Sequence, residues 1–175
     1  MIRILLLDDE PNILTALKRL LREEDWLIDT FTRAEEALDA LQAHRYGVIV
    51  SDYQMPGMDG VTYLQFARQR QPDAIRLILS AHGDRQSMIN AINRAEIYRF
   101  LSKPWEDYEI QAAIRSAVDL YRVKVENREL LAEIHRQKDL LRLREEELMR
   151  LETENPGITR VARDADGSII IDESA

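Results

Sequence analysis

The chain has 175 residues, and its 24 Lys and Arg side chains against 32 Asp and Glu side chains give a formal net charge of -8. This length allows one domain of ordinary size with an extension, or two small domains. Hydrophobic residues make up 45% of the chain, enough for a packed core, and there is no cysteine. The composition excludes a disulfide scaffold, a thiolate zinc site and a cysteine nucleophile, and its acidic balance argues against a phosphate-binding surface over the whole chain.

The apolar runs of the sequence are short. The N-terminal run from Ile4 to Leu7 stops at Asp8 and Asp9, which is not the pattern of a signal peptide. No run approaches the ~18 apolar residues of a membrane span. We therefore expect a soluble, cytoplasmic protein without a membrane partner.

Apolar runs alternate with segments of helical period over residues 1–118, the first predicted domain. In chain order, the pattern predicts a strand at 2–7, a helix at 11–23, a strand at 26–31, a helix opened by the capping box Thr32-Arg33-Ala34-Glu35, a strand at 48–50, a helix at 60–70, a strand at 75–79, a helix at 84–93, a strand at 98–101 and a helix from near Glu106. Strict alternation with short links predicts an α/β fold, a doubly wound five-stranded parallel sheet.

Polar side chains follow four of the five predicted strands. Asp8 and Asp9 follow the first strand, Asp52 the third, Ser80 the fourth and Lys103 the fifth. These side chains should converge, because ligands of open parallel sheets bind at the carboxyl ends of the strands. Three carboxylates at one spot repel each other, and Mg²⁺ would relieve that repulsion through oxygen ligands. A carboxylate beside a metal ion and a lysine is suited to phosphoryl transfer, with the carboxylate as nucleophile.

Each of these residues also has an ordinary structural interpretation. An Asp-Asp pair at a strand end is usually a loop start or a helix cap, and a serine there usually caps the backbone. A lysine before a proline is usually a turn residue. Their joint occurrence at four strand ends favours a site.

Together these motifs resemble the receiver domain of two-component response regulators, over about residues 1–120. The quoted residues are Asp8-Asp9-Glu10, Asp52 with Met55-Pro56-Gly57-Met58-Asp59-Gly60, Ser80-Ala81, and Tyr98-Arg99-Phe100-Leu101-Ser102-Lys103-Pro104-Trp105. The resemblance implies a flavodoxin-like receiver whose phosphorylation site is Asp52, with a histidine kinase or a phosphotransfer protein as its phosphodonor. It implies no enzyme activity beyond self-catalysed phosphorylation and dephosphorylation.

The resemblance also implies roles for the remaining site residues. Mg²⁺ would be bound directly by Asp9, by Asp52 and by the backbone carbonyl of Gln54, and through water by Asp8. Ser80 and Lys103 would contact the phosphoryl oxygens and complete the catalytic group with Asp52.

The resemblance also implies a switch and a cis peptide bond. Ser80 and Tyr98 would form the switch, although a half-buried strand tyrosine is the ordinary alternative for Tyr98. The Lys103-Pro104 bond is typically cis in this family. An aspartyl-phosphate phosphatase is a rival function, but it needs an acid at position 54, where this chain has Gln.

The last helical pattern continues as a second predicted region, residues 119–153, without Gly or Pro. In the best heptad register, the dimerisation positions a and d include Leu120, Val123, Asn127, Leu130, Ile134, Leu141, Leu148 and Leu151. We call these eight residues the seam. Gln137 and Arg144 occupy the other two d positions and weaken its middle. A parallel coiled-coil homodimer is predicted, with one asparagine setting its register.

Two alternatives to self-association remain for this helix. It could pack back on the receiver, but a helix of this length would reach ~70 Å and outrun it. It could bind DNA, but its basic residues are interleaved with acids at nearly every turn, which argues against nucleic acid as a partner.

Residues 154–175 form the predicted tail. Asn155-Pro156-Gly157 stops the helix, and the segments 158–163 and 168–172 flank Asp164-Ala165-Asp166-Gly167 as in a β-hairpin. The downstream partner stays unidentified at this level. The chain could instead be the receiver fragment of a larger regulator, a transcription factor or a cyclic-dinucleotide enzyme, whose output domain lies outside it.

Overall fold

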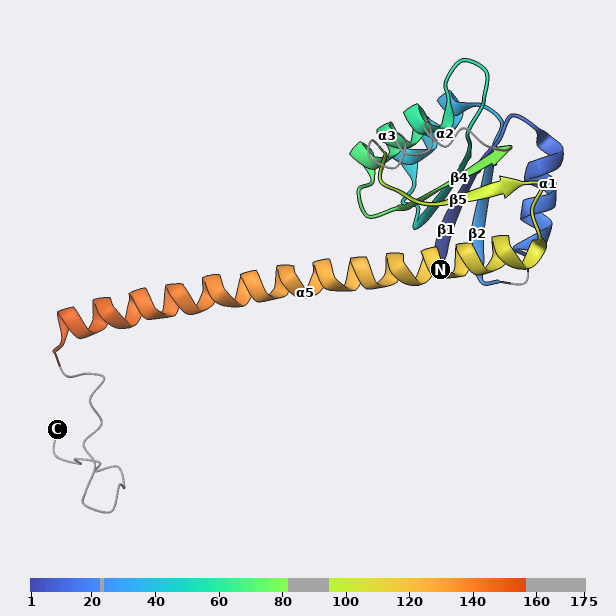
Figure 1. Ribbon diagram of the computed structural model, residues 1–175. Coiled ribbons are helices and arrows are strands. Elements are labelled where there is room, and N and C mark those ends of the chain that lie inside the picture. Colours follow the sequence, from blue (N-terminus) through green and yellow to red (C-terminus); the bar gives the residue numbers. More distant parts are fainter. Residues whose placement is uncertain (23, 82–94, 157–175) are drawn as a thin grey trace. The chain divides into compact units, whose positions relative to one another are not determined.

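The computed structural model describes residues 1–22, 24–81 and 95–156. The predicted helix at 84–93 and the predicted tail hairpin therefore lie outside the described residues. The chain divides into two compact units, residues 1–126 and residues 127–175, and each is described by itself (Figure 1).

The first unit contains one parallel sheet, whose strand order β2-β1-β3-β4-β5 confirms the predicted doubly wound fold. Its strands are β1 (Ile2–Leu7), β2 (Trp26–Phe31), β3 (Val48–Asp52), β4 (Ile75–Ala81) and β5 (Ile97–Lys103). The last three strands end later than the sequence pattern predicts. Asp52, Ser80 and Lys103 therefore lie within the strands, where ladder hydrogen bonds fix their positions.

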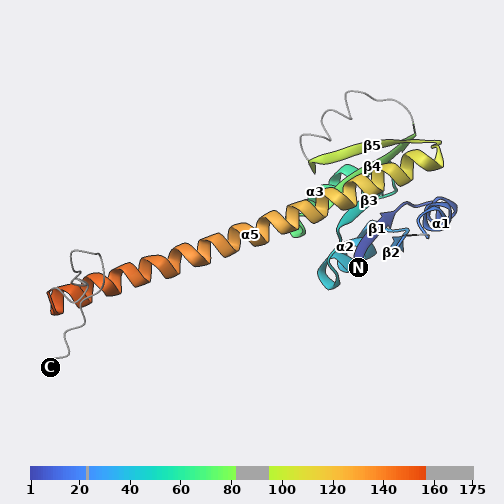
Figure 2. The ribbon, with the colours of Figure 1, turned by 90° about the horizontal axis from the view of Figure 1, so that it is seen from below.

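Helices cover both faces of the sheet (Figures 1 and 2). The described helices are α1 (Pro11–Leu20), α2 (Ala34–Ala43), α3 (Gly60–Arg70) and α5 (Asp107–Glu154). One apolar cluster joins the sheet to α1 and to the first turns of α5, and a second joins it to α2 and α3. Because both faces are buried, β1 and β3 read as continuous apolar runs rather than alternating ones.

The predicted capping box at Thr32 is wrong. The N-cap of α2 is Arg33, and no side chain accepts a hydrogen bond there. The helix begins one residue too late for the Thr32 hydroxyl to occupy the cap position, since the capping oxygen must come from the N-cap residue itself. By contrast, Asp59 caps α3 by accepting a hydrogen bond from the backbone N–H of Thr62 at 2.8 Å.

The predicted long helix is confirmed, since α5 continues without a break through Glu154. In the second unit, residues 127–150 are all exposed, including the apolar side chains. Six of the eight seam residues are among the large exposed hydrophobic side chains, namely Leu120, Val123, Leu130, Ile134, Leu141 and Leu148. Among the described residues, no helix is both long and apolar enough to cross a membrane.

Candidate functional site

The carboxyl ends of β1, β3, β4 and β5 meet at a cavity of about 270 Å³. Its lining contains the predicted site residues Asp9, Asp52, Gln54, Ser80 and Lys103. Asp8 lies just behind it, fully buried. The structure therefore brings together every residue predicted for phosphorylation, for metal binding and for the contact with phosphoryl oxygens.

Lys103 joins the two buried carboxylates of the site. Its Nζ lies 2.6 Å from Oδ2 of Asp8 and 2.5 Å from Oδ1 of Asp52. The other oxygen of each carboxylate accepts a backbone N–H: Oδ1 of Asp8 from Glu10 at 2.9 Å, and Oδ2 of Asp52 from Gln54 at 2.8 Å. These contacts hold both carboxylates in fixed orientations.

Burial and ion pairing both act on the pKa values of Asp8 and Lys103. Burial raises the pKa of Asp8 above its usual value, although the hydrogen bond from Lys103 and the N–H of Glu10 oppose that change. Burial alone would lower the pKa of Lys103, but hydrogen bonds to Asp52 and Asp8 outweigh it, so that pKa is raised. Lys103 is thus a cation throughout the physiological pH range.

The start of α3 supports Asp52 from behind. The N–H of Gly60 donates to the carbonyl of Tyr53 at 3.0 Å. A Cβ on Gly60 would lie 1.9 Å from the carbonyl oxygen of Asp52, so only glycine permits this approach. Sequence reasoning did not single out this role, although the Asp59-Gly60 pair before a helical segment was a usable signal.

The donor set of the cavity fits a hard divalent cation. In the described part of the chain, no three acidic or histidine side chains form a ready-made metal cage. However, the buried carboxylates of Asp8 and Asp52 share the single ammonium of Lys103, which leaves one negative charge uncompensated. Asp9 is exposed at the rim, and the lining oxygens are of the kind that Mg²⁺ prefers.

The strand register separates the predicted switch residues. Ser80 pairs with Ser102, and Tyr98 lies four residues before Ser102. Tyr98 lies at a register shift, because Arg76 pairs with Ile97 and the next residue of β4, Leu77, pairs with Arg99. That spacing corresponds to roughly 13 Å along the strand. Tyr98 is 44% exposed, so the structure does not bring it to Ser80.

Phe100 is an aromatic residue of β5 that the sequence analysis did not single out. It pairs with Ile78, two residues before Ser80, and packs partly buried against the cluster beneath α2 and α3. Side chains two residues apart share a face of a strand, so Phe100 and Ser80 lie on the same side of the sheet. The Lys103-Pro104 bond is cis, as the resemblance implies.

Comparison with known proteins agrees with this geometry. A family model described as the response regulator receiver domain matches residues 4–115. The hydrogenase transcriptional regulatory protein HoxA of Bradyrhizobium diazoefficiens is 35% identical over 125 residues, which cover 70% of this chain and 25% of that protein. The transcriptional regulatory protein FixJ of the same species is 34% identical, over 66% of this chain and 56% of FixJ.

Solved structures give the same result. The signal receiver domain of an HD domain-containing protein from Pseudomonas fluorescens Pf-5 is 34% identical with a TM-score of 0.68, covering 71% of this chain and 92% of that one. The beryllofluoride-activated NtrC4 receiver domain dimer is 32% identical with a TM-score of 0.65, covering 69% and 99%. This chain spans about a quarter of the full length of HoxA. The sheet, the cavity and these matches show that the chain belongs to the response regulator receiver family.

Proposed function

We propose that the chain is a phosphorelay receiver that accepts a phosphoryl group on Asp52 from a histidine kinase or a phosphotransfer protein. The observation that carries this proposal is the cavity in which Lys103 pairs with Asp52 and Asp8 at the ends of three strands. Asp52 is 6% exposed, yet it lines the cavity and is open to a donor there.

The chemistry needs no residue beyond those present. A carboxylate oxygen of Asp52 forms the new bond to phosphorus, while the bond between phosphorus and the donor nitrogen breaks and the donor imidazole takes up a proton. Lys103 and the Ser80 hydroxyl stabilise the phosphoryl oxygens as charge develops on them. Mg²⁺, held by Asp9, Asp52 and the Gln54 carbonyl with Asp8 behind them, would neutralise negative charge between the carboxylates and the phosphoryl group.

Labelling with acetyl phosphate tests this assignment. Intact-mass spectrometry should show one added phosphoryl group on the wild type only when magnesium is present. Asp52→Asn should abolish the addition, and Asp9→Ala should raise the magnesium concentration needed. Asp59→Asn is the matched control, because Asp59 is an exposed acid that caps α3. Undiminished labelling of Asp52→Asn would disprove the assignment.

The proposed switch consists of Ser80 and Phe100, with Phe100 replacing Tyr98. A phosphoryl group on Asp52 offers strong acceptor oxygens to the Ser80 hydroxyl. Movement of Ser80 toward them would change the space available to Phe100 on the same face of the sheet. The result is a population shift between two receiver states.

We further propose that the output is self-association through α5 as a parallel coiled-coil homodimer. The exposed apolar seam residues support it, because a helix with a long apolar stripe and no cover is stabilised by a partner helix. Light scattering across a concentration series is the direct test. The second candidate function is the receiver module of a larger regulator, which the partial coverage of HoxA favours.

A further inference from the structure

The outer edge of β2 is open. β2 ends the sheet, and among the described residues it pairs only with β1. The carbonyl of Phe31 accepts the N–H of Asp8 at 3.2 Å, so Phe31 faces β1. Because backbone groups alternate along a strand, the N–H and C=O groups of Ile28 and Thr30 point away from the sheet.

This edge has little of the usual protection against another strand. Natural edge strands are shielded by lysine, proline, bulges or inward-pointing charges. β2 has the sequence WLIDTF, without lysine or proline, and its one charged residue, Asp29, is partly buried and bound within the domain. Asp29 accepts hydrogen bonds from Arg3 at 2.7 Å and from the hydroxyl of Tyr46 at 2.8 Å.

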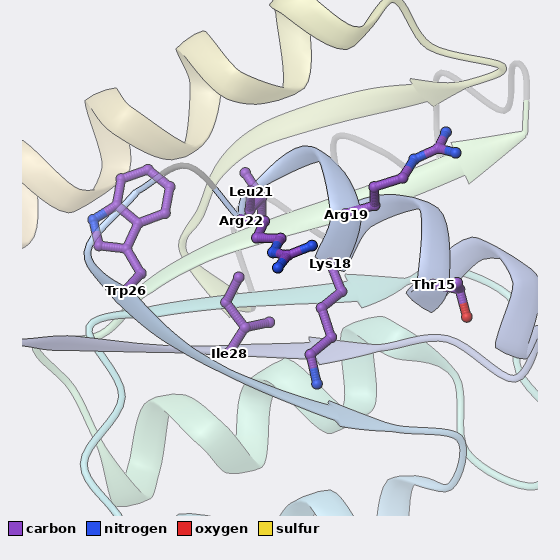
Figure 3. A pocket seen from close by; sticks show the side chains of 7 residues that line it. All are labelled: Thr15, Lys18, Arg19, Leu21, Arg22, Trp26 and Ile28. Atoms are coloured by element: carbon purple, nitrogen blue, oxygen red, sulfur yellow. The ribbon is translucent and has the colours of Figure 1, made fainter.

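A cavity of about 450 Å³, larger than the cavity at Asp52, lies between β2 and the flank of α1 (Figure 3). Its apolar part is formed by Leu21, Trp26 and Ile28, and the remaining lining residues are Thr15, Lys18, Arg19 and Arg22. Among the described residues that line it, three of seven are therefore cationic and none is acidic, in a chain whose net charge is -8.

The cations of this cavity are available. Lys18, Arg19 and Arg22 are exposed, and none of their side chains forms a hydrogen bond or ion pair with a described residue. Lys18 lies in the last turn of α1, and Arg22 lies two residues past its end. Figure 3 shows Lys18 on α1 and Arg22 just past its end on the side of Ile28, whereas Arg19 extends in another direction.

We propose that β2 and the flank of α1 bind an extended acidic segment of a partner protein, which adds to the sheet as a strand beside β2. Main-chain hydrogen bonds to Ile28 and Thr30 would give affinity, and alternate side chains would give specificity. Those side chains lie on the face of Trp26 and Ile28, where acids meet Lys18 and Arg22 and an apolar residue enters the cavity. A small anion would use the cations but not the free strand edge, so the edge favours a peptide.

Fluorescence anisotropy with a labelled peptide, Glu-Thr-Leu-Thr-Glu-Thr, tests the proposal on the full chain. Its Glu and Leu side chains share one face of the strand. It should bind about tenfold more tightly than Lys-Thr-Leu-Thr-Lys-Thr, and more weakly as salt rises. The same acidic peptide with every residue N-methylated keeps every side chain but has no backbone N–H to donate to β2, and it should not bind.

Protein variants separate the two parts of the site. Lys18→Glu with Arg22→Glu should weaken binding of the acidic peptide about tenfold, and the control pair Arg45→Glu with Arg70→Glu, with the same charge change elsewhere, should not. In the complex, the N–H groups of Ile28 and Thr30 should exchange more slowly with deuterium. Equal binding of the basic or N-methylated peptide overturns the proposal. The proposal is also overturned if the acidic peptide does not bind and the Thr30→Pro substitution abolishes self-association of the protein. In that case the edge of β2 pairs with a second copy of this chain.

Discussion

Gly60 at the start of α3 and Asp52 at the end of β3 meet backbone to backbone, with 1.9 Å between the carbonyl oxygen of Asp52 and a Cβ built on Gly60. Gly60→Ala must therefore push the helix away from the strand end that holds Asp52. We expect a loss of about 2–3 kcal/mol in the free energy of unfolding, measured by urea denaturation. Labelling by acetyl phosphate should slow as well, because Asp52 loses its fixed position.

Gly57→Ala is the matched control for this substitution. Gly57 has a φ of 82° and nothing within 4 Å of a built Cβ, so alanine there meets backbone strain without a clash. It should lose only about 1 kcal/mol and label at the wild-type rate. Equal effects of the two alanines would show that the contact between Gly60 and Asp52 is not tight.

Asp8→Asn should stabilise the protein at neutral pH without magnesium. The folded state raises the pKa of Asp8, chiefly by burial, so folding favours the protonated carboxyl. That contribution is present below the unfolded value of about 3.8 and is lost as pH rises through the folded value. At pH 7 the ionised, buried Asp8 thus opposes folding, and its removal should add ~1 kcal/mol in urea denaturation.

Asp29→Asn provides a control of opposite sign. Burial alone would raise the pKa of Asp29, but hydrogen bonds from Arg3 and Tyr46 outweigh it and lower that pKa. Its contribution is present above the unfolded pKa and is lost as pH falls through the folded value. Asp29→Asn should therefore destabilise the folded protein at pH 7.

A stability difference between wild type and Asp8→Asn that stays constant from pH 3 to pH 7 would contradict the assignment for Asp8.

The sequence was sufficient to predict the sheet and the residues around Asp52, because parallel strands bring their carboxyl ends to one edge whatever the details of packing. It was not sufficient to place Phe100 on the face of Ser80, since the register near Tyr98 depends on a bulge. That bulge adjoins the fully buried Arg76, whose Nε donates to the carbonyl of Ala95 at 2.8 Å. The cavity beside Trp26 was also missed, because it depends on how α1 packs across β2.

Asn127→Leu should tighten the proposed self-association. Asn127 occupies an a position of the seam, where a polar residue specifies register and oligomeric state at a cost in stability. Sedimentation equilibrium should show a lower dissociation constant for the leucine variant, with a shift toward higher oligomers. Glu126→Gln, which changes the neighbouring exposed position, is the control. Monomers of both wild type and Asn127→Leu at high micromolar concentration would contradict the coiled coil.

The switch prediction compares two aromatic residues of β5. Beryllofluoride added with magnesium mimics a phosphoryl group on Asp52, and it should tighten wild-type self-association by about tenfold, the effect of a coupling free energy near 1.4 kcal/mol. Phe100→Leu should lose most of that coupling, because Phe100 shares the face of Ser80 and packs against the core. Tyr98→Leu should keep it, since Tyr98 is 44% exposed and lies outside the regular ladder. Sedimentation of the three proteins with and without the mimic is the measurement. Loss of coupling in Tyr98→Leu with full coupling in Phe100→Leu would assign the switch to Tyr98 and show that strand register does not identify it.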